Sequence, residues 1–298
     1  MRKLQLMGVL LLLASCVCSS CEKANLGDDG DEPEPENGVR IELRISRFEQ
    51  IAFDGAQAKS RAATEVSELC SRLTFAIFDA GGSRVKSVSQ TSTDKSFGTF
   101  GVSLPQGSYR VVVIAHNGNG SVSVTDPEKI KFPDNKVTDT FYCCEDIEVT
   151  DARSYALELK RAVAMFRLVI TDDVPASVKQ FKFYYTGGSS TLNAITGRGC
   201  VDSRQTEYRG VTAEMAGKPC QFDVFTFPHA DEGELKMTVT ALDAAGTTVA
   251  EKLFEAVPVQ LGWISKYSGQ FFDGTTQTGD ITFTLSADGN WQEITHSY

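Results

Sequence analysis

Short apolar segments separated by turn residues are the feature that most limits what this chain can fold into. The first segment, Val39 to Ile45, alternates apolar and polar residues, which is typical of a strand with one buried face. Similar segments follow, with turns such as Asp79 to Gly82 and Asn117 to Gly120 between them. No run of ten or more residues repeats the helical spacing. We therefore predict an all-β protein built from sandwiches.

The length of the chain indicates two domains. Its 298 residues are roughly twice the length of a typical domain of about 100–150 residues. The apolar spacing from Ala63 to Leu73 predicts one or two helical turns, and the remaining pattern is strands and turns. We predict an N-terminal β-sandwich over residues 39–151 and a C-terminal β-sandwich over residues 152–298.

The N-terminus has the pattern of an exported lipoprotein. Two basic residues, Arg2 and Lys3, precede an apolar run that is too short to span a bilayer. The run ends in Leu13-Ala14-Ser15-Cys16, which resembles a bacterial lipobox. We predict a signal peptide over residues 1–15 and acylation of Cys16. Cys21, which follows two serines, is the alternative acceptor.

The segment after the lipobox is acidic and lacks apolar residues that could form a core. Residues 22–38 carry seven carboxylates, one lysine and no aromatic side chain. Such a composition cannot offset the entropy lost on ordering, so we predict a disordered tether over residues 16–38. The carboxylates lack the spacing of a calcium-binding loop, and no metal site is predicted.

Charge and motifs argue against nucleic-acid binding and catalysis. The chain has 39 acidic and 29 basic residues, a net charge of −10, whereas phosphate binding needs a basic face. Its three histidines do not form a zinc motif, and no nucleophile elbow or phosphate-binding loop is present. His116 is expected at the end of a strand, with its polar atoms satisfied. We predict no enzyme activity and no cofactor.

The cysteines of the mature chain leave several arrangements open. A disulfide between Cys200 and Cys220 would close a loop of about 20 residues and contribute up to about 3 kcal/mol. Cys70 could pair with Cys143 or with Cys144, but not with both, because adjacent strand residues face opposite ways. Free cysteines buried as small apolar residues are the equal alternative.

Arg61 is a candidate protease site. It lies in the polar stretch Lys59-Ser60-Arg61-Ala62, and accessible tips of this composition are preferred cleavage sites. An ordinary surface arginine is the other interpretation.

Several segments form a recognisable order along the chain. They are the lipobox, Leu73 to Asp79, Phe97 to Phe100, Leu104 to Tyr109, Val111 to Asn117, Val137 to Phe141 and Leu159 to Ala164. Each motif is structural and modest alone, but their order is specific. In this order they resemble the fimbrillin superfamily that builds the type V pili of Bacteroidales, especially the FimB-type anchor subunits.

The resemblance implies two tandem transthyretin-like β-sandwiches with Greek-key character, held at the outer membrane and cell surface by lipid. It also implies assembly with other fimbrial subunits by donor-strand exchange, and adhesion to host surfaces or other bacteria. The strand Val39 to Ile45 is the expected place of exchange. A stalk subunit would lose it by cleavage after Arg61, whereas an anchor or minor subunit would keep it. The alternative is a surface glycan-binding lipoprotein, with Trp263 and Trp291 as candidate platforms.

Overall fold

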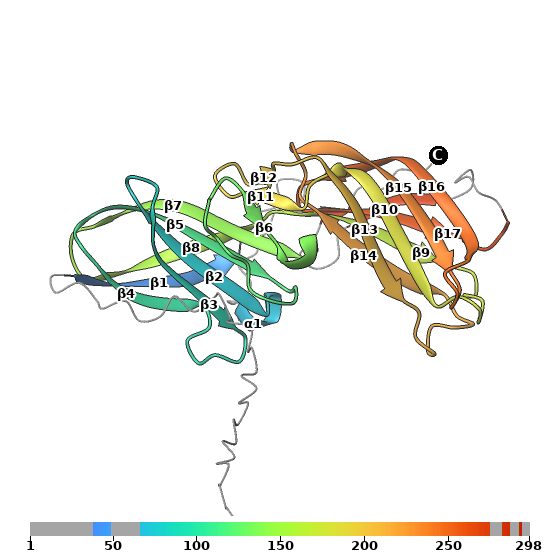
Figure 1. Cartoon of the computed structure of the whole chain (residues 1–298), viewed down its shortest axis with the longest axis horizontal. Coiled ribbons are helices and arrows are strands. Elements are labelled where there is room, and N and C mark those ends of the chain that lie inside the picture. The colour runs from blue at the N-terminus through green and yellow to red at the C-terminus, as the bar shows by residue number, and fades with distance from the viewer. Residues whose placement is uncertain (1–37, 49–65, 275–281, 287–291, 294–298) are drawn as a thin grey trace, which may run out of the picture.

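The computed structural model describes residues 38–48, 66–274, 282–286 and 292–293. The predictions for the signal peptide, the acylated Cys16 or Cys21, nearly all of the tether, Arg61 and Trp291 lie outside these residues. In the described part, strands dominate and the one α-helix, α1 (Val66–Leu69), is a single turn where the apolar spacing predicts it. The predicted all-β fold with two sandwiches is confirmed (Figure 1).

The N-terminal module is a seven-stranded sheet that folds over into two layers. The strand order is β3-β2-β5-β7-β8-β1-β4. Strands β7 and β8 pair at only two positions, and apolar side chains from β3-β2-β5-β7 and β8-β1-β4 meet in one core. The strands are β1 (Val39–Phe48), β2 (Arg72–Asp79), β3 (Arg84–Thr91), β4 (Thr99–Leu104), β5 (Gly107–His116), β7 (Thr140–Val149) and β8 (Arg153–Arg161).

The C-terminal module has two separate sheets around a second core. The sheet orders are β13-β10-β15-β16 and β14-β9-β17-β18, with β19 pairing β17. Phe166, Phe181 and Phe254 are buried in this core and pack against other aromatic rings. The strands are β9 (Ala164–Ile170), β10 (Gln180–Gly188), β13 (Ser203–Gly210), β14 (Cys220–Thr226), β15 (Glu232–Leu242), β16 (Thr248–Gln260), β17 (Trp263–Gly269), β18 (Thr282–Ser286) and β19 (Gln292–Glu293).

The predicted domain boundary at residues 151 and 152 is wrong. Strand β8 pairs in parallel with β1 and antiparallel with β7, so it belongs to the N-terminal module. The boundary therefore follows Arg161. Only Ala162 and Val163 separate β8 from β9, and both are fully buried. The linker between the modules is thus packed inside the protein.

A third, small sheet joins the two modules. It consists of β6 (Ile130–Lys131) from the N-terminal module and β11 (Thr191–Asn193) and β12 (Arg198–Gly199) from the C-terminal module. Leu192 pairs with Ile130 across the junction. A third apolar cluster surrounds this sheet and includes Phe132 and Phe227, whose ring centroids lie 5.1 Å apart. Figure 1 shows this sheet between the two larger bodies.

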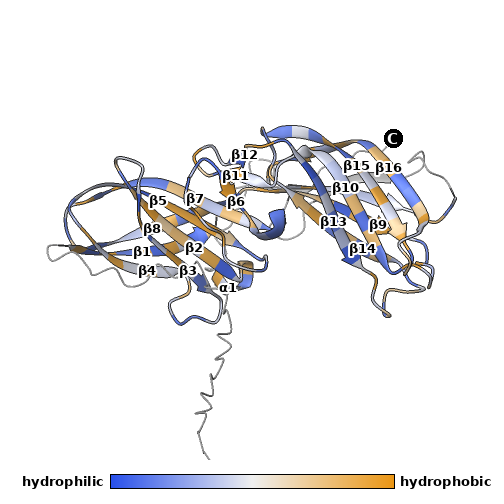
Figure 2. Ribbon diagram, in the orientation of Figure 1, coloured by the Kyte–Doolittle hydropathy of each residue, from blue (hydrophilic) through white to orange (hydrophobic). Residues whose placement is uncertain are grey.

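The junction explains why β2 and β5 are apolar on both faces. Phe75 and Val113 face the core of the N-terminal module, whereas Phe78 and Val112 face the junction cluster. The covering segment between β5 and β7 contains β6 and the short 3-10 helix η1 (Pro133–Asn135). Strands buried on both faces have continuous apolar runs instead of alternation. Figure 2 shows these two strands as predominantly hydrophobic.

Gly197 offers a direct test of the junction. It lies between β11 and β12 with φ of +69°, and a Cβ there would clash with the Tyr142 hydroxyl of the N-terminal module. Gly217 has a similar φ of +72°, but a Cβ there would meet nothing within 4 Å. Gly217→Ala should cost about 1–2 kcal/mol for the left-handed backbone alone. Gly197→Ala should cost about 1–3 kcal/mol more, because of the overlap.

Urea unfolding of the two variants measures this difference. Equal losses of unfolding free energy in Gly197→Ala and Gly217→Ala would show that the loop and Tyr142 are not held together.

Candidate functional site

Strand β1 is the first strand in the described part of the chain, but it lies in the interior of its sheet. It pairs antiparallel with β4 and parallel with β8, and Leu43 has Phe100 on one side and Tyr155 on the other. Neither neighbour follows β1 directly in the sequence. Strand β1 can therefore leave without interrupting any other strand, and its departure would open a slot between β4 and β8.

The side chains of β1 make this slot apolar. Ile41, Leu43 and Ile45 are buried in the core, and the residues between them are exposed, as the alternation predicts. Burial of each such side chain is worth about 1.5–3 kcal/mol. A module without β1 would expose matching apolar surface together with unpaired backbone groups on β4 and β8.

Polar contacts near the end of β1 add register. The hydroxyl of Ser46 donates to the carbonyl oxygen of Leu157 at 2.9 Å, and the backbone N–H of Ile45 donates to the carbonyl oxygen of Gly98 at 2.9 Å. Arg47 forms an ion pair with Glu158, but its side chain is 70% exposed, so the pair contributes little to stability. Backbone pairing and apolar burial therefore hold β1 in place.

The sequence left open a disulfide between Cys200 and Cys220 or free cysteines, and in this structure the described cysteines are all free thiols. Cys200 is exposed next to β12, whereas Cys220 lies in β14. The number of residues between the two cysteines does not show that one follows β12 and the other lies in β14. Cys70, Cys143 and Cys144 are also unpaired, which corresponds to the alternative of free cysteines.

Burial makes these thiols poor nucleophiles. Desolvation, with a smaller effect of Asp139, raises the pKa of Cys70 to about 12. Desolvation and then Asp172 raise the pKa of Cys220 to about 11. The pKa of Cys143 is raised as well, chiefly by desolvation. The reactive species of cysteine is the thiolate, which these pKa values disfavour at neutral pH.

His116 is buried at the end of β5 and only half satisfied. Its Nδ1 accepts a hydrogen bond from the backbone N–H of Gly118 at 3.0 Å, so the proton of the neutral ring is on Nε2. Nε2 has no hydrogen-bond partner. The ring packs edge-on against Phe132 of the junction cluster. His116 is thus a packing residue of the junction, and the expectation that its polar atoms are all satisfied is wrong for Nε2.

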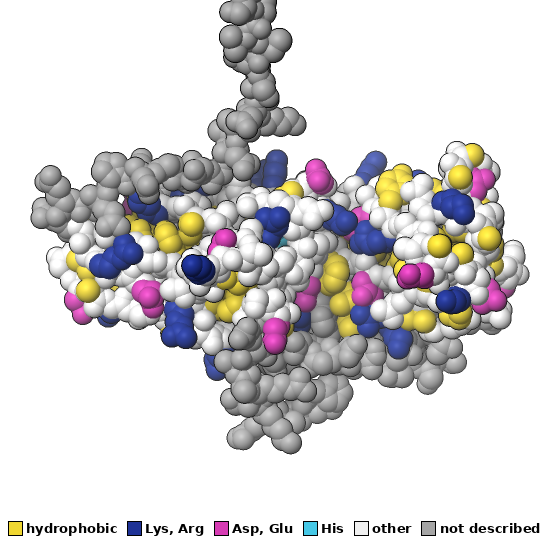
Figure 3. All heavy atoms as spheres, turned by 90° about the horizontal axis from the view of Figure 1, so that it is seen from below, with side chains coloured by type: hydrophobic (Ala, Val, Ile, Leu, Met, Phe, Trp, Pro, Cys, Tyr) yellow, Lys and Arg dark blue, Asp and Glu magenta, His cyan; other side chains and the backbone are white. Residues whose placement is uncertain are grey.

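Trp263 is half-buried in β17 and does not form an open aromatic platform. Within the described ranges, no three His, Cys, Asp or Glu side chains gather as metal ligands would. The described helices include none with the length and apolar character to cross a membrane. Figure 3 shows basic and acidic side chains interspersed on one face of the molecule, without a continuous basic surface there.

Comparison with known proteins identifies relatives of the fold. A family described as "Family of unknown function (DUF6562)" matches residues 34–298. A provisionally assigned adhesin from Bacteroides thetaiotaomicron is 13% identical with a TM-score of 0.50, covering 89% of this chain and 99% of its own. Another from Bacteroides ovatus is 12% identical with a TM-score of 0.50, covering 88% and 95%.

The fimbrial anchor protein Mfa2 from Porphyromonas gingivalis is also similar, at 12% identity and a TM-score of 0.46, covering 88% of this chain and all of its own. The search of curated proteins found no match. At these identities the likeness to solved structures concerns the fold.

The buried imidazole of His116 predicts a pH dependence of stability. Desolvation, with a smaller effect of Arg72, lowers the pKa of His116 from 6.5 to about 4. Between these values the unfolded chain binds a proton that the folded chain does not. The neutral His116 therefore contributes fully to the free energy of unfolding above pH 6.5. This contribution, about 3 kcal/mol, is lost as the pH falls to about 4.

Unfolding free energies of wild type, His116→Gln and His229→Gln should be compared from pH 4 to 7. As the pH falls from 6.5 to about 4, the unfolding free energy of the wild type should decrease relative to that of His116→Gln. His229 is exposed, and its variant is the control for the loss of an imidazole outside the junction. Parallel curves for wild type and His116→Gln would contradict the assignment.

Proposed function

The chain belongs to the family of unknown function DUF6562, and we propose that it is a non-enzymatic subunit of a fimbrium. In this proposal it is the lipid-anchored or a minor subunit, attached to the outer membrane through Cys16, or alternatively Cys21, and it assembles with other subunits by strand exchange. Adhesion to host surfaces or other bacteria follows from its place on the cell surface.

The observation that carries the proposal is the position of β1. The first described strand is amphipathic and lies inside its sheet, and the described part of the module follows it only at its C-terminal end, an arrangement that suits strand exchange. The fold shared with provisionally assigned adhesins of Bacteroides supports the same class of function. The order of fimbrillin-like motifs along the sequence supports it independently.

The fate of β1 separates an anchor from a stalk subunit. A subunit that keeps β1 has no empty slot, so it occupies an end of the fimbrium. A stalk subunit would be cleaved after Arg61, which lies between β1 and α1 in sequence. The loss of β1 would then open the slot to a strand from the next subunit. We favour the anchor or minor subunit, and the stalk pilin is the alternative.

The mature N-terminus tests this choice. Mass spectrometry of membranes and of sheared fimbriae should find the chain in the membrane fraction, beginning at an acylated Cys16 and retaining the peptide of β1. A Cys16→Ala variant should move the protein to the soluble fraction, and a Cys21→Ala variant should not. A mature chain that begins at Ala62 throughout the fimbrial shaft would overturn the anchor assignment.

A disulfide that locks β1 in place gives a second test. Arg44 and Thr99 lie opposite each other on β1 and β4, where Cβ atoms are about 4.5–5.5 Å apart and a small adjustment allows a bridge. Cells that express oxidised Arg44→Cys/Thr99→Cys should carry normal amounts of fimbriae, because an anchor keeps β1.

The single variant Arg44→Cys is the matched control, since it adds a thiol without a partner. Assembly that fails in the oxidised double variant and returns on reduction would show that β1 must leave, as in a stalk subunit.

A further inference from the structure

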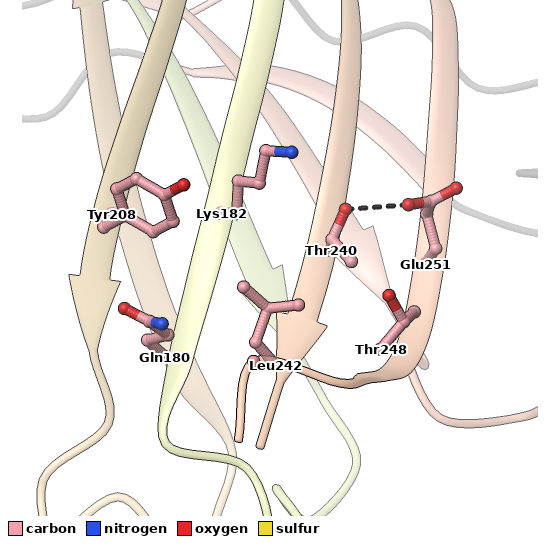
Figure 4. A pocket seen from close by; sticks show the side chains of 8 residues that line it. Gln180, Lys182, Tyr208, Thr240, Leu242, Thr248 and Glu251 are labelled. Carbon is pink, nitrogen blue, oxygen red and sulfur yellow. Dashed lines mark hydrogen bonds between the residues drawn. The ribbon is translucent and has the colours of Figure 1, made fainter. Parts of the chain in front are cut away.

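The outer face of the sheet β13-β10-β15-β16 carries a shallow hollow. The proposed strand exchange at β1 does not involve it. Its lining side chains come from the neighbouring strands β13, β10, β15 and β16 (Figure 4). The opposite face of the same strands packs into the module core through residues such as Phe181 and Phe183. The hollow therefore faces away from the core, on the outside of the C-terminal module.

One cross-strand row forms the main line of this hollow. Lys182 lies opposite Tyr208 on one side and Thr240 on the other, and Thr240 lies opposite Glu251. The row crosses all four strands, a distance of about 14 Å at the usual strand spacing of about 4.8 Å. The hydroxyl of Thr240 donates to Glu251 at 2.8 Å, which holds that carboxylate over the sheet.

A second row lies beside the first. Gln180 pairs with Leu242, and Leu242 pairs with Thr248. All three residues line the same hollow. The two rows together provide an amide, an ammonium, a carboxylate and hydroxyl groups within one open depression. These groups supply both hydrogen-bond donors and acceptors.

Two exposed tyrosines stand on the same face. Tyr208 is 53% exposed, and Tyr184, two residues from Lys182 on β10, is 37% exposed. Exposed rings on a sheet face offer flat apolar surface for stacking, and their hydroxyls remain available for hydrogen bonds. Figure 4 shows the Tyr208 hydroxyl directed toward Lys182.

From this combination we propose that the hollow binds a neutral oligosaccharide. A sugar ring has one apolar face, which would stack on Tyr208, and hydroxyl groups that would bond to Lys182, Gln180 and Glu251. The single lysine and single glutamate of the lining cancel in charge, which favours a ligand without net charge. The open, elongated row suits a short linear chain of sugars better than a single small molecule.

This site differs from the aromatic platform expected at the tryptophans. Trp263 lies in β17 of the other sheet and is half-buried. The proposal does not require strand exchange, because the row is complete within one chain. Failure of sugar binding and failure of assembly are therefore separate outcomes, measured on purified protein and on cells.

The test is a screen of the purified mature chain on a glycan array, followed by calorimetric titration with the best neutral oligosaccharide. Tyr208→Ala and Glu251→Gln should each lower the affinity at least about tenfold. Ile195→Ala removes an exposed apolar side chain in the loop between β11 and β12, away from the hollow, and should leave the affinity unchanged. Circular dichroism would confirm that each variant is folded.

Three results would overturn the proposal. The first is the absence of binding to any neutral glycan, and the second is binding restricted to sulfated or uronic acid glycans. The third is sugar binding that Tyr208→Ala leaves intact while Trp263→Ala abolishes it, which would move the site to β17.

Discussion

The two modules depend on a shared apolar core at their junction. Most of β2 and β5 is buried on both faces, because the junction cluster covers the face that the N-terminal core leaves free. The pairing of β6 with β11 and the buried Ala162 and Val163 close the same region. Neither module would bury its apolar surface completely without the other, so we regard the pair as one folding body with three cores.

Strand β1 likewise belongs to an apolar core that is incomplete without it. Its three buried side chains complete the N-terminal core, while its connection to the rest of the module runs through one end. The strand is thus needed for stability and is separable in topology. This combination distinguishes it from β2 or β5, which could not be replaced without opening the junction as well.

The sequence predicts local features well and long-range ones poorly. Alternation correctly identifies Ile41, Leu43 and Ile45 as buried, because period two depends only on the strand itself. The boundary is misplaced because the alternation of β8 reads the same in either module, and only its pairing with β1 and β7 decides. The junction sheet is invisible in the sequence, since β6 and β11 are two and three residues long.

For the candidate sites too, the sequence predicts local features better than long-range arrangements. The spacing of Cys200 and Cys220 allowed a bridge, but their positions in the fold do not bring them into one. Tryptophan content pointed to Trp263, whereas the exposed rings belong to Tyr184 and Tyr208. Which tyrosine faces outward depends on the phase of the strand against the core, and the row that links Tyr208 to Glu251 requires the register of four strands.

The buried two-residue linker has a mechanical consequence. A pull applied at one end of the molecule passes to the other through hydrogen-bonded strands and packed rings, with no slack to take up between the modules. Shear from flowing liquid would be transmitted at once instead of being absorbed at a hinge. The connection between the two modules is therefore stiff.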